Sequence, residues 1–195
     1  MKHQPLILTI FVLAIMSMLL VNTVHSTNTQ HSFIGIKPQL VADFIFSVIE
    51  ADRTLYAKQV VDRMQDKGTV IASESWMQRN AIPLPAQMLL MAGKRVEENG
   101  LGLTYRLASL WPIYEKNGPA TKFERTGLEA VKQYPEKPFS GIVNKGNQPY
   151  FQAIYSDKAV SKACVNCHNS HVLSPKHDYQ LHEVMGGVII SFPLE

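Results

Sequence analysis

The chain has 195 residues, of which 46% are hydrophobic and 18% charged, and its formal net charge is +3 at pH 7. This length suits one domain with a single hydrophobic core. The Lys and Arg residues form no run and no stripe interleaved with aromatic residues, which argues against nucleic acid as a partner.

The first 26 residues have the layout of a secretory signal peptide. Lys2 and His3 precede an apolar run over residues 6–21, and Val24 and Ser26 precede the expected cleavage point. The apolar run is shorter than the roughly 20 residues that span a bilayer comfortably, so an uncleaved membrane anchor is the weaker alternative. We expect residues 27–195 to form a single domain that is periplasmic or otherwise exported.

The mature chain begins with the pattern of a long amphipathic helix, from residue 36 to about residue 64. Its apolar residues recur at intervals of three and four positions. They are Leu40, Val41, Phe44, Ile45, Val48, Ile49 and Leu55. Gly68 is the expected C′ residue. Such a helix can flank a sensor core, and it can also form the contact of a homodimer.

Helices and strands alternate in the rest of the chain. Helical spacing covers residues 83–99 and 120–134, and a short helix is expected at the cysteine motif described next. Strands are expected over residues 70–72, 101–110 and 184–192, with a hairpin over 139–156. The chain thus has a long helix first, then strands interleaved with helices, and a hairpin late in the sequence. This order predicts an α+β fold with flanking helices around an antiparallel sheet. The pattern differs from that of an all-helical cytochrome c.

The most informative residues are Cys164, Cys167 and His168, which form a Cys-x-x-Cys-His motif typical of c-type haem attachment. Two thiols must add to the two vinyl groups on one edge of the porphyrin, and an imidazole must reach the iron. Helical positions i, i+3 and i+4 place all three side chains on one face. We therefore predict one covalently bound haem c, with His168 as the proximal iron ligand.

Three other interpretations of this motif are a redox pair, half of a zinc site and a local disulfide. A zinc site needs about four ligands, and the chain has no second Cys-x-x-Cys pair. His171 or His177 could complete such a site only at irregular spacing. A thioredoxin-like pair follows a strand at a helix start, whereas a mostly polar run over residues 156–162 precedes Cys164.

Three stretches resemble a bacterial family of exported, PAS-like c-type haem domains, long catalogued as a domain of unknown function. The stretches are residues 82–88, residues 103–113, and residue 146 through the cysteine motif to residue 193. The resemblance implies a PAS-like antiparallel sheet that cradles the haem, and a role in redox or gas sensing. Related domains are fused to kinases and chemoreceptors, so here we expect output through a separate signalling or redox partner protein.

The sixth iron ligand decides between sensing and electron transfer. The candidates are the side chains of Met77, Met88, Met91, Met185, His171, His177 and His182. Met88 ranks first, and an open or water-occupied position is the alternative. His171 is discounted because a continuing helix would keep it on the proximal side. Tyr105 and Arg106 could reach a haem propionate or a distal ligand.

Two classes of function follow from these observations. The first is a sensor in which a change of iron redox state, or binding of NO, CO or O2, shifts the fold around the sheet. The second is an electron carrier of an exported respiratory or nitrogen-cycle chain. A haem peroxidase is a weaker third option. Otherwise we expect no enzymatic activity, because the sequence shows no pattern of a nucleophilic residue with a neighbouring base.

Overall fold

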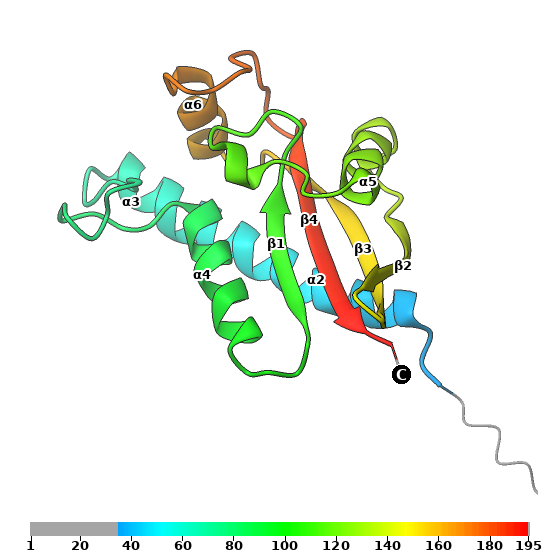
Figure 1. The fold of residues 1–195 in the computed structure, drawn as a ribbon. Helices are drawn as coiled ribbons and strands as arrows, with labels where there is room; N and C mark the ends of the chain where they lie inside the picture. Colours follow the sequence, from blue (N-terminus) through cyan, green and yellow to red (C-terminus); the bar gives the residue numbers. More distant parts are fainter. Residues whose placement is uncertain (1–34, 195) are drawn as a thin grey trace, which may run out of the picture. The chain divides into compact units, whose positions relative to one another are not determined.

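Four antiparallel strands form an open sheet at the centre of residues 35–194, the part of the chain that the computed structural model describes (Figure 1). The strands are β1 (Thr104–Ala108), β2 (Phe139–Lys145), β3 (Gln148–Lys158) and β4 (Val184–Pro193). Their order across the sheet is β1-β4-β3-β2, so the last strand lies between the first and the third. The predicted α+β class is confirmed, while the expected signal peptide lies outside the described residues.

The long N-terminal helix covers one face of the sheet. α2 (Pro38–Leu55) continues through a π-helical stretch (Tyr56–Asp62) into α3 (Arg63–Asp66), and Gly68 follows with a φ of +63°. The inner side chains of α2 pack against alternate residues of β3 and β4, as the two-residue period of a strand requires. These inner residues are Ala42, Ile45, Phe46 and Ile49. The long helix predicted from residue 36 is thus confirmed.

α5 (Lys122–Gln133) covers the opposite face (Figure 1). The hydroxyl of Thr121 caps this helix by accepting a hydrogen bond from the Glu124 amide at 3.1 Å. Leu128 and Val131 of α5 are buried against the sheet in a cluster with Ile154 and Ile189. Phe151, Ala153 and Tyr155 of β3 face α2, whereas Ile154 between them faces α5. Successive residues of β3 are therefore buried on opposite faces of the sheet.

One further helix lies near the end of the sheet where β1 and β3 finish and β4 starts, and another runs beside β1. α4 (Pro85–Glu97) packs along β1, and α6 (Lys162–Ser170) follows β3. The close approach of α4 requires Gly93, because a Cβ atom there would lie 2.5 Å from the Tyr105 carbonyl oxygen.

The expected strand over residues 70–72 is reduced to one isolated bridge between Ala72 and Ile82, since the chain between them is taken up by turns. Within residues 35–194, no helix is both long and apolar enough to cross a bilayer.

Candidate functional site

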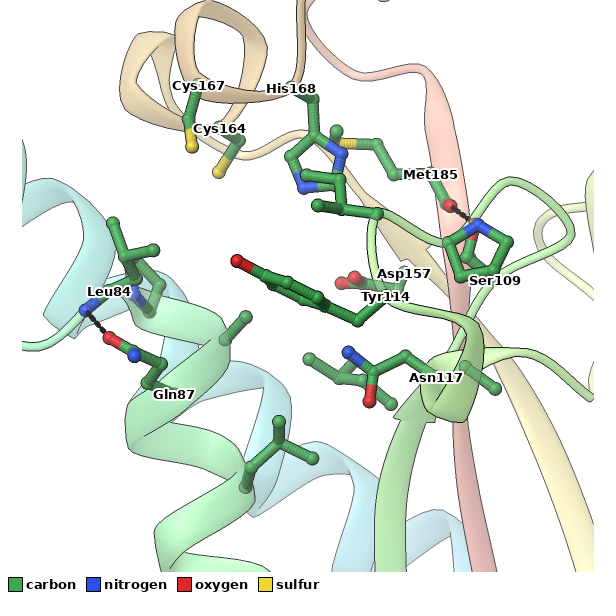
Figure 2. A pocket seen from close by; sticks show the side chains of 18 of the residues that line it. Leu84, Gln87, Ser109, Tyr114, Asn117, Asp157, Cys164, Cys167, His168 and Met185 are labelled. Carbon is green, nitrogen blue, oxygen red and sulfur yellow. Dashed lines mark hydrogen bonds between the residues drawn. The ribbon is translucent and has the colours of Figure 1, made fainter. Parts of the chain in front are cut away.

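α6 presents the cysteine motif toward the end of the sheet. Cys164, Cys167 and His168 share one helical turn and one face. Figure 2 shows both sulfur atoms and the imidazole projecting from α6 toward the same cavity. Both thiols are free. The fold therefore brings together the three side chains that the sequence singled out.

The cavity has a volume of about 370 Å³, within the range of about 300–1,000 Å³ that is common for small-molecule sites. Its walls come from α4, the end of β1, the loop after β1, and the start of β4. Most of the side chains that form these walls are apolar or aromatic. They include Leu84, Leu90, Leu107, Trp111, Ile113 and Met185.

The imidazole of His168 is mostly buried at this cavity. Burial lowers its pKa, and the nearby His171 and Arg53 lower it further, so the ring is neutral at neutral pH. Its Nδ1 atom is buried and has no hydrogen-bond partner among the described residues. A neutral imidazole is the form that binds metal ions, and a buried polar atom without a partner is uncommon in a complete site.

The Cys167 thiol has the opposite character from an activated thiol of a redox pair. Burial raises the pKa of Cys167, and the nearby Glu74 and Cys164 raise it further. Reactive Cys-x-x-Cys pairs have a thiol whose pKa is lowered by positive surroundings. The Cys167 thiol is therefore protonated at neutral pH and is not itself an activated nucleophile.

A bidentate ion pair lies deeper in the same cavity, between α2 and the end of β3. Arg53 Nη1 lies 2.6 Å from Asp157 Oδ1, and Arg53 Nη2 donates to Asp157 Oδ2 at 3.0 Å. Both side chains are about nine-tenths buried. Burial raises the pKa of Asp157, and the Arg53 charge opposes this rise without reversing it. Arg53 Nε has no partner among the described residues, so the guanidinium has a donor to spare.

Hydrogen bonds fix the walls around the motif. The Leu84 amide donates to Gln87 Oε1 at 3.0 Å, and Gln87 Nε2 donates to the Glu74 carbonyl oxygen at 2.8 Å (Figure 2 shows the first bond). Ser109 Oγ donates to the Met185 carbonyl oxygen at 2.6 Å. These bonds hold the start of α4, the end of β1 and the start of β4 in place, so the cavity has a defined shape.

A polar cluster of Glu74, Tyr114 and His171 was not predicted. Tyr114 donates from its hydroxyl to Glu74 Oε2 at 2.9 Å, and His171 Nε2 lies 3.4 Å from the same carboxylate. The hydrogen bond to Glu74, followed by burial, raises the pKa of Tyr114. Tyr114 directly follows the stretch 103–113 that carried the family resemblance, whereas the sequence around Glu74 gave no signal.

Among the seven candidates for a sixth ligand, only Met185 lines the cavity, and it lies beside His168 rather than opposite to it (Figure 2). Met88 is 44% exposed, because α4 turns its neighbours Gln87 and Leu90 toward the cavity instead. Met77 and Met91 are also exposed. The structure therefore does not bring Met88 to the motif, and its role as a ligand stays a prediction.

The three histidine candidates lie elsewhere. His171 does not continue α6, because the helix ends at Ser170 and His171 has an extended ψ of 130°. His177 is exposed, with its Nδ1 atom 3.0 Å from the Asn169 carbonyl oxygen. His182 adopts a φ of +69° and lines a different cavity.

Arg106 does not reach the cavity, in contrast to the expectation from the sequence. Its Nη2 atom lies 2.5 Å from Glu124 Oε2, on the side of the sheet that α5 covers. Glu124 is buried, and its carboxylate also accepts a hydrogen bond from the Ala120 amide at 2.6 Å. This arginine therefore joins β1 to the start of α5.

The fold and the site define an α+β domain with a Cys-x-x-Cys-His motif beside an apolar cavity. The sequence model of the Tll0287-like family, described as Tll0287, matches residues 37–193, and the chain belongs to this family. One solved structure, described as the cyanobacterial heme-protein Tll0287, matches with 12% sequence identity and a TM-score of 0.41, over 82% of this chain and 98% of that chain. No curated protein matches the chain. The family match confirms the resemblance noted from the sequence.

Proposed function

We propose that this chain is an exported c-type haem protein, with one haem joined by thioether bonds to Cys164 and Cys167 and with His168 as the proximal iron ligand. The observation that carries the proposal is the convergence of two sulfur atoms and a neutral, unpartnered imidazole on one mainly apolar cavity. Membership of the Tll0287-like family supports haem binding, since its namesake is described as a heme-protein.

The attachment chemistry uses two reduced thiols, and both cysteines are free. Each thiol would add across one vinyl group, with a carbon–sulfur bond formed and the thiol proton transferred to the neighbouring vinyl carbon. This addition needs no net oxidation, and it uses both cysteines of the chain. When bound, the haem supplies an iron that can change its oxidation state and bind diatomic gases.

The surrounding residues provide binding, water exclusion and charge. Leu84, Leu107 and Ile113 give the apolar walls that a porphyrin needs. The spare Nε–H donor of Arg53 suits a carboxylate group, which a haem carries as its propionates. These residues also exclude water from the cavity. The low polarity that results would influence the relative stability of the oxidised and reduced iron, and so its reduction potential.

We further propose that the protein senses redox state or a diatomic gas such as NO, CO or O2. Tyr114 lies across the cavity from the His168 imidazole in Figure 2, and Asn117 lies near it. Among residues 35–194, none of the seven methionine and histidine candidates lines the cavity on that side. His171, whose ring centroid lies 6.1 Å from that of Tyr114, is held by the Glu74 carboxylate at 3.4 Å. A distal pocket with a phenol in place of a strong ligand suits gas binding better than rapid electron transfer.

The proposal includes a PAS-like arrangement of the domain and export to the periplasm. An open antiparallel sheet with helices on both faces supports the former. The signal-peptide layout of residues 1–26 supports the latter. A sensor of this kind acts through a separate redox or signalling partner.

Absorption spectra of the oxidised and reduced protein, with and without CO and NO, test the sensor proposal. We expect the reduced protein to bind both gases, with a shifted Soret band. Tyr114→Phe removes the hydroxyl that donates to Glu74 at 2.9 Å and should change the gas affinity by about tenfold, the value of one hydrogen bond of about 1.4 kcal/mol on this side of the cavity. Tyr134→Phe, on the exposed end of α5, is the matched control. A six-coordinate low-spin spectrum that neither gas alters would favour the electron carrier instead.

A further inference from the structure

The outer face of α2 carries a stripe of exposed apolar side chains. Leu40, Phe44, Val48 and Leu55 are 43%, 59%, 62% and 56% exposed, and Ile36, just before the helix, is 64% exposed. We call these five residues the α2 stripe. Their spacing places them along one side of the helix, with the small exposed residues Ser47 and Ala51 among them.

This stripe is separate from the face of α2 that packs on the sheet. The inner face is formed by Ala42, Ile45, Phe46 and Ile49, all of which belong to the sheet-facing core cluster. The exposed acidic residues Glu50 and Asp52 lie on the flanks of the stripe rather than within it. A helix that is apolar on two sides normally buries both of them, and a continuous exposed apolar patch marks an interaction surface.

We propose that the α2 stripe joins two copies of this chain in an antiparallel helix pair. The five side chains expose roughly 500 Å² of surface in each copy, by their exposed fractions. Two copies that cover this stripe would together bury about 1,000 Å², which is the size at which specific protein interfaces begin. Flanking contacts add to this area.

The stripe is complementary to itself in one antiparallel register. A two-fold axis between residues 47 and 48 places Leu40 opposite Leu55 and Phe44 opposite Ala51 of the second copy. Each large phenyl ring then faces a methyl group, and each Leu faces a Leu. Because both copies use the same patch, the contact closes as a dimer. Ile36, just before the helix, then lies opposite Gln59 of the second copy.

The charges beside the stripe favour a second copy over a lipid surface. Helices that lie on anionic membranes carry Lys and Arg along their polar face. Here Glu50 and Asp52 flank the stripe along the helix and Asp43 also lies on α2, while the exposed Lys37 lies at its start, before the helix. Acidic flanks are repelled by anionic headgroups, whereas they remain hydrated beside an apolar dimer seam.

Sedimentation equilibrium of the exported, haem-loaded protein tests the proposal. We expect a dimer at micromolar concentration, and a loss of affinity of at least 100-fold in the double variant Phe44→Lys/Val48→Lys. Glu50→Arg, on the flank, is the matched control and should remain dimeric. Circular dichroism and the haem spectrum show whether each variant is folded. A wild-type monomer, or a dimer that persists in the folded double variant, would overturn the proposal.

Cysteine cross-linking tests the register independently. Ser47→Cys lies next to the two-fold axis, so two copies should form an intermolecular disulfide on oxidation. Leu40→Cys should not pair with itself, because its two positions lie roughly 20 Å apart along an antiparallel pair at 1.5 Å per residue. Efficient Leu40→Cys cross-linking without Ser47→Cys cross-linking would contradict the antiparallel register, and vesicle binding in place of dimerisation would identify a membrane surface as the occupant.

Discussion

The His168→Ala variant is expected to retain its thioether-bound haem and to lose the proximal imidazole, with a change from the wild-type spectrum to a high-spin one. The neutral, buried ring of His168 is the only imidazole among residues 35–194 that lines the cavity. Absorption and electron paramagnetic resonance spectra measure the change. Added imidazole should restore a spectrum close to that of the wild type, since the vacated space can admit the free ligand.

Two further variants make this prediction specific. His177→Ala removes an exposed loop histidine and should leave the spectrum unchanged. Met185 is buried beside His168, so its thioether is the side chain best placed to replace the lost ligand. If His168→Ala keeps a low-spin iron, the double variant with Met185→Leu decides whether Met185 has substituted. If both His168→Ala and the double variant His168→Ala/Met185→Leu keep the wild-type spectrum, the assignment of His168 as the proximal ligand is contradicted.

Arg53→Met is expected to lower the free energy of unfolding by about 3–5 kcal/mol, the usual result of removing one partner of a buried ion pair. Asp157 would then be buried without its bidentate partner, at the point where α2 meets the end of β3. Urea unfolding of the haem-loaded protein measures the loss. The double variant Arg53→Met/Asp157→Leu should recover most of it, because no buried charge remains.

The effect of Arg53→Met should depend on pH in a defined direction. Burial already raises the pKa of Asp157 in the folded protein, and loss of the Arg53 charge raises it further. A carboxyl group with a raised pKa in the folded state destabilises that state as the pH rises through the interval between its unfolded and folded pKa. The defect should therefore be larger at neutral pH than at pH near 4. A loss below about 1 kcal/mol at neutral pH would contradict the buried ion pair.

The sequence predicted the elements and the motif because both depend on local spacing. The three- and four-residue period over α2, the turn at residue 146 and the Cys-x-x-Cys-His spacing each involve residues close together in the chain. Even so, the period did not reveal the π-helical stretch over residues 56–62, where one extra residue per turn shifts the buried face. That shift depends on packing rather than on local preference.

The polar cluster of Glu74, Tyr114 and His171 could not be predicted from the sequence for a different reason. Glu74, Tyr114 and His171 lie in three segments that meet only in the folded chain. Met88 illustrates a second limit, because a single step along α4 separates it from Gln87, whose side chain lines the cavity. Helical spacing identifies a stripe but does not say which side of it faces a neighbouring cavity.

The intact mass of the denatured protein, exported from a host with a complete cytochrome c maturation system, tests the central claim most directly. We predict the mass of the chain from residue 27 onward plus one haem, and the mass of the chain alone for the Cys164→Ala/Cys167→Ala variant. A wild-type protein with the mass of its polypeptide only would contradict covalent attachment and the function proposed from it.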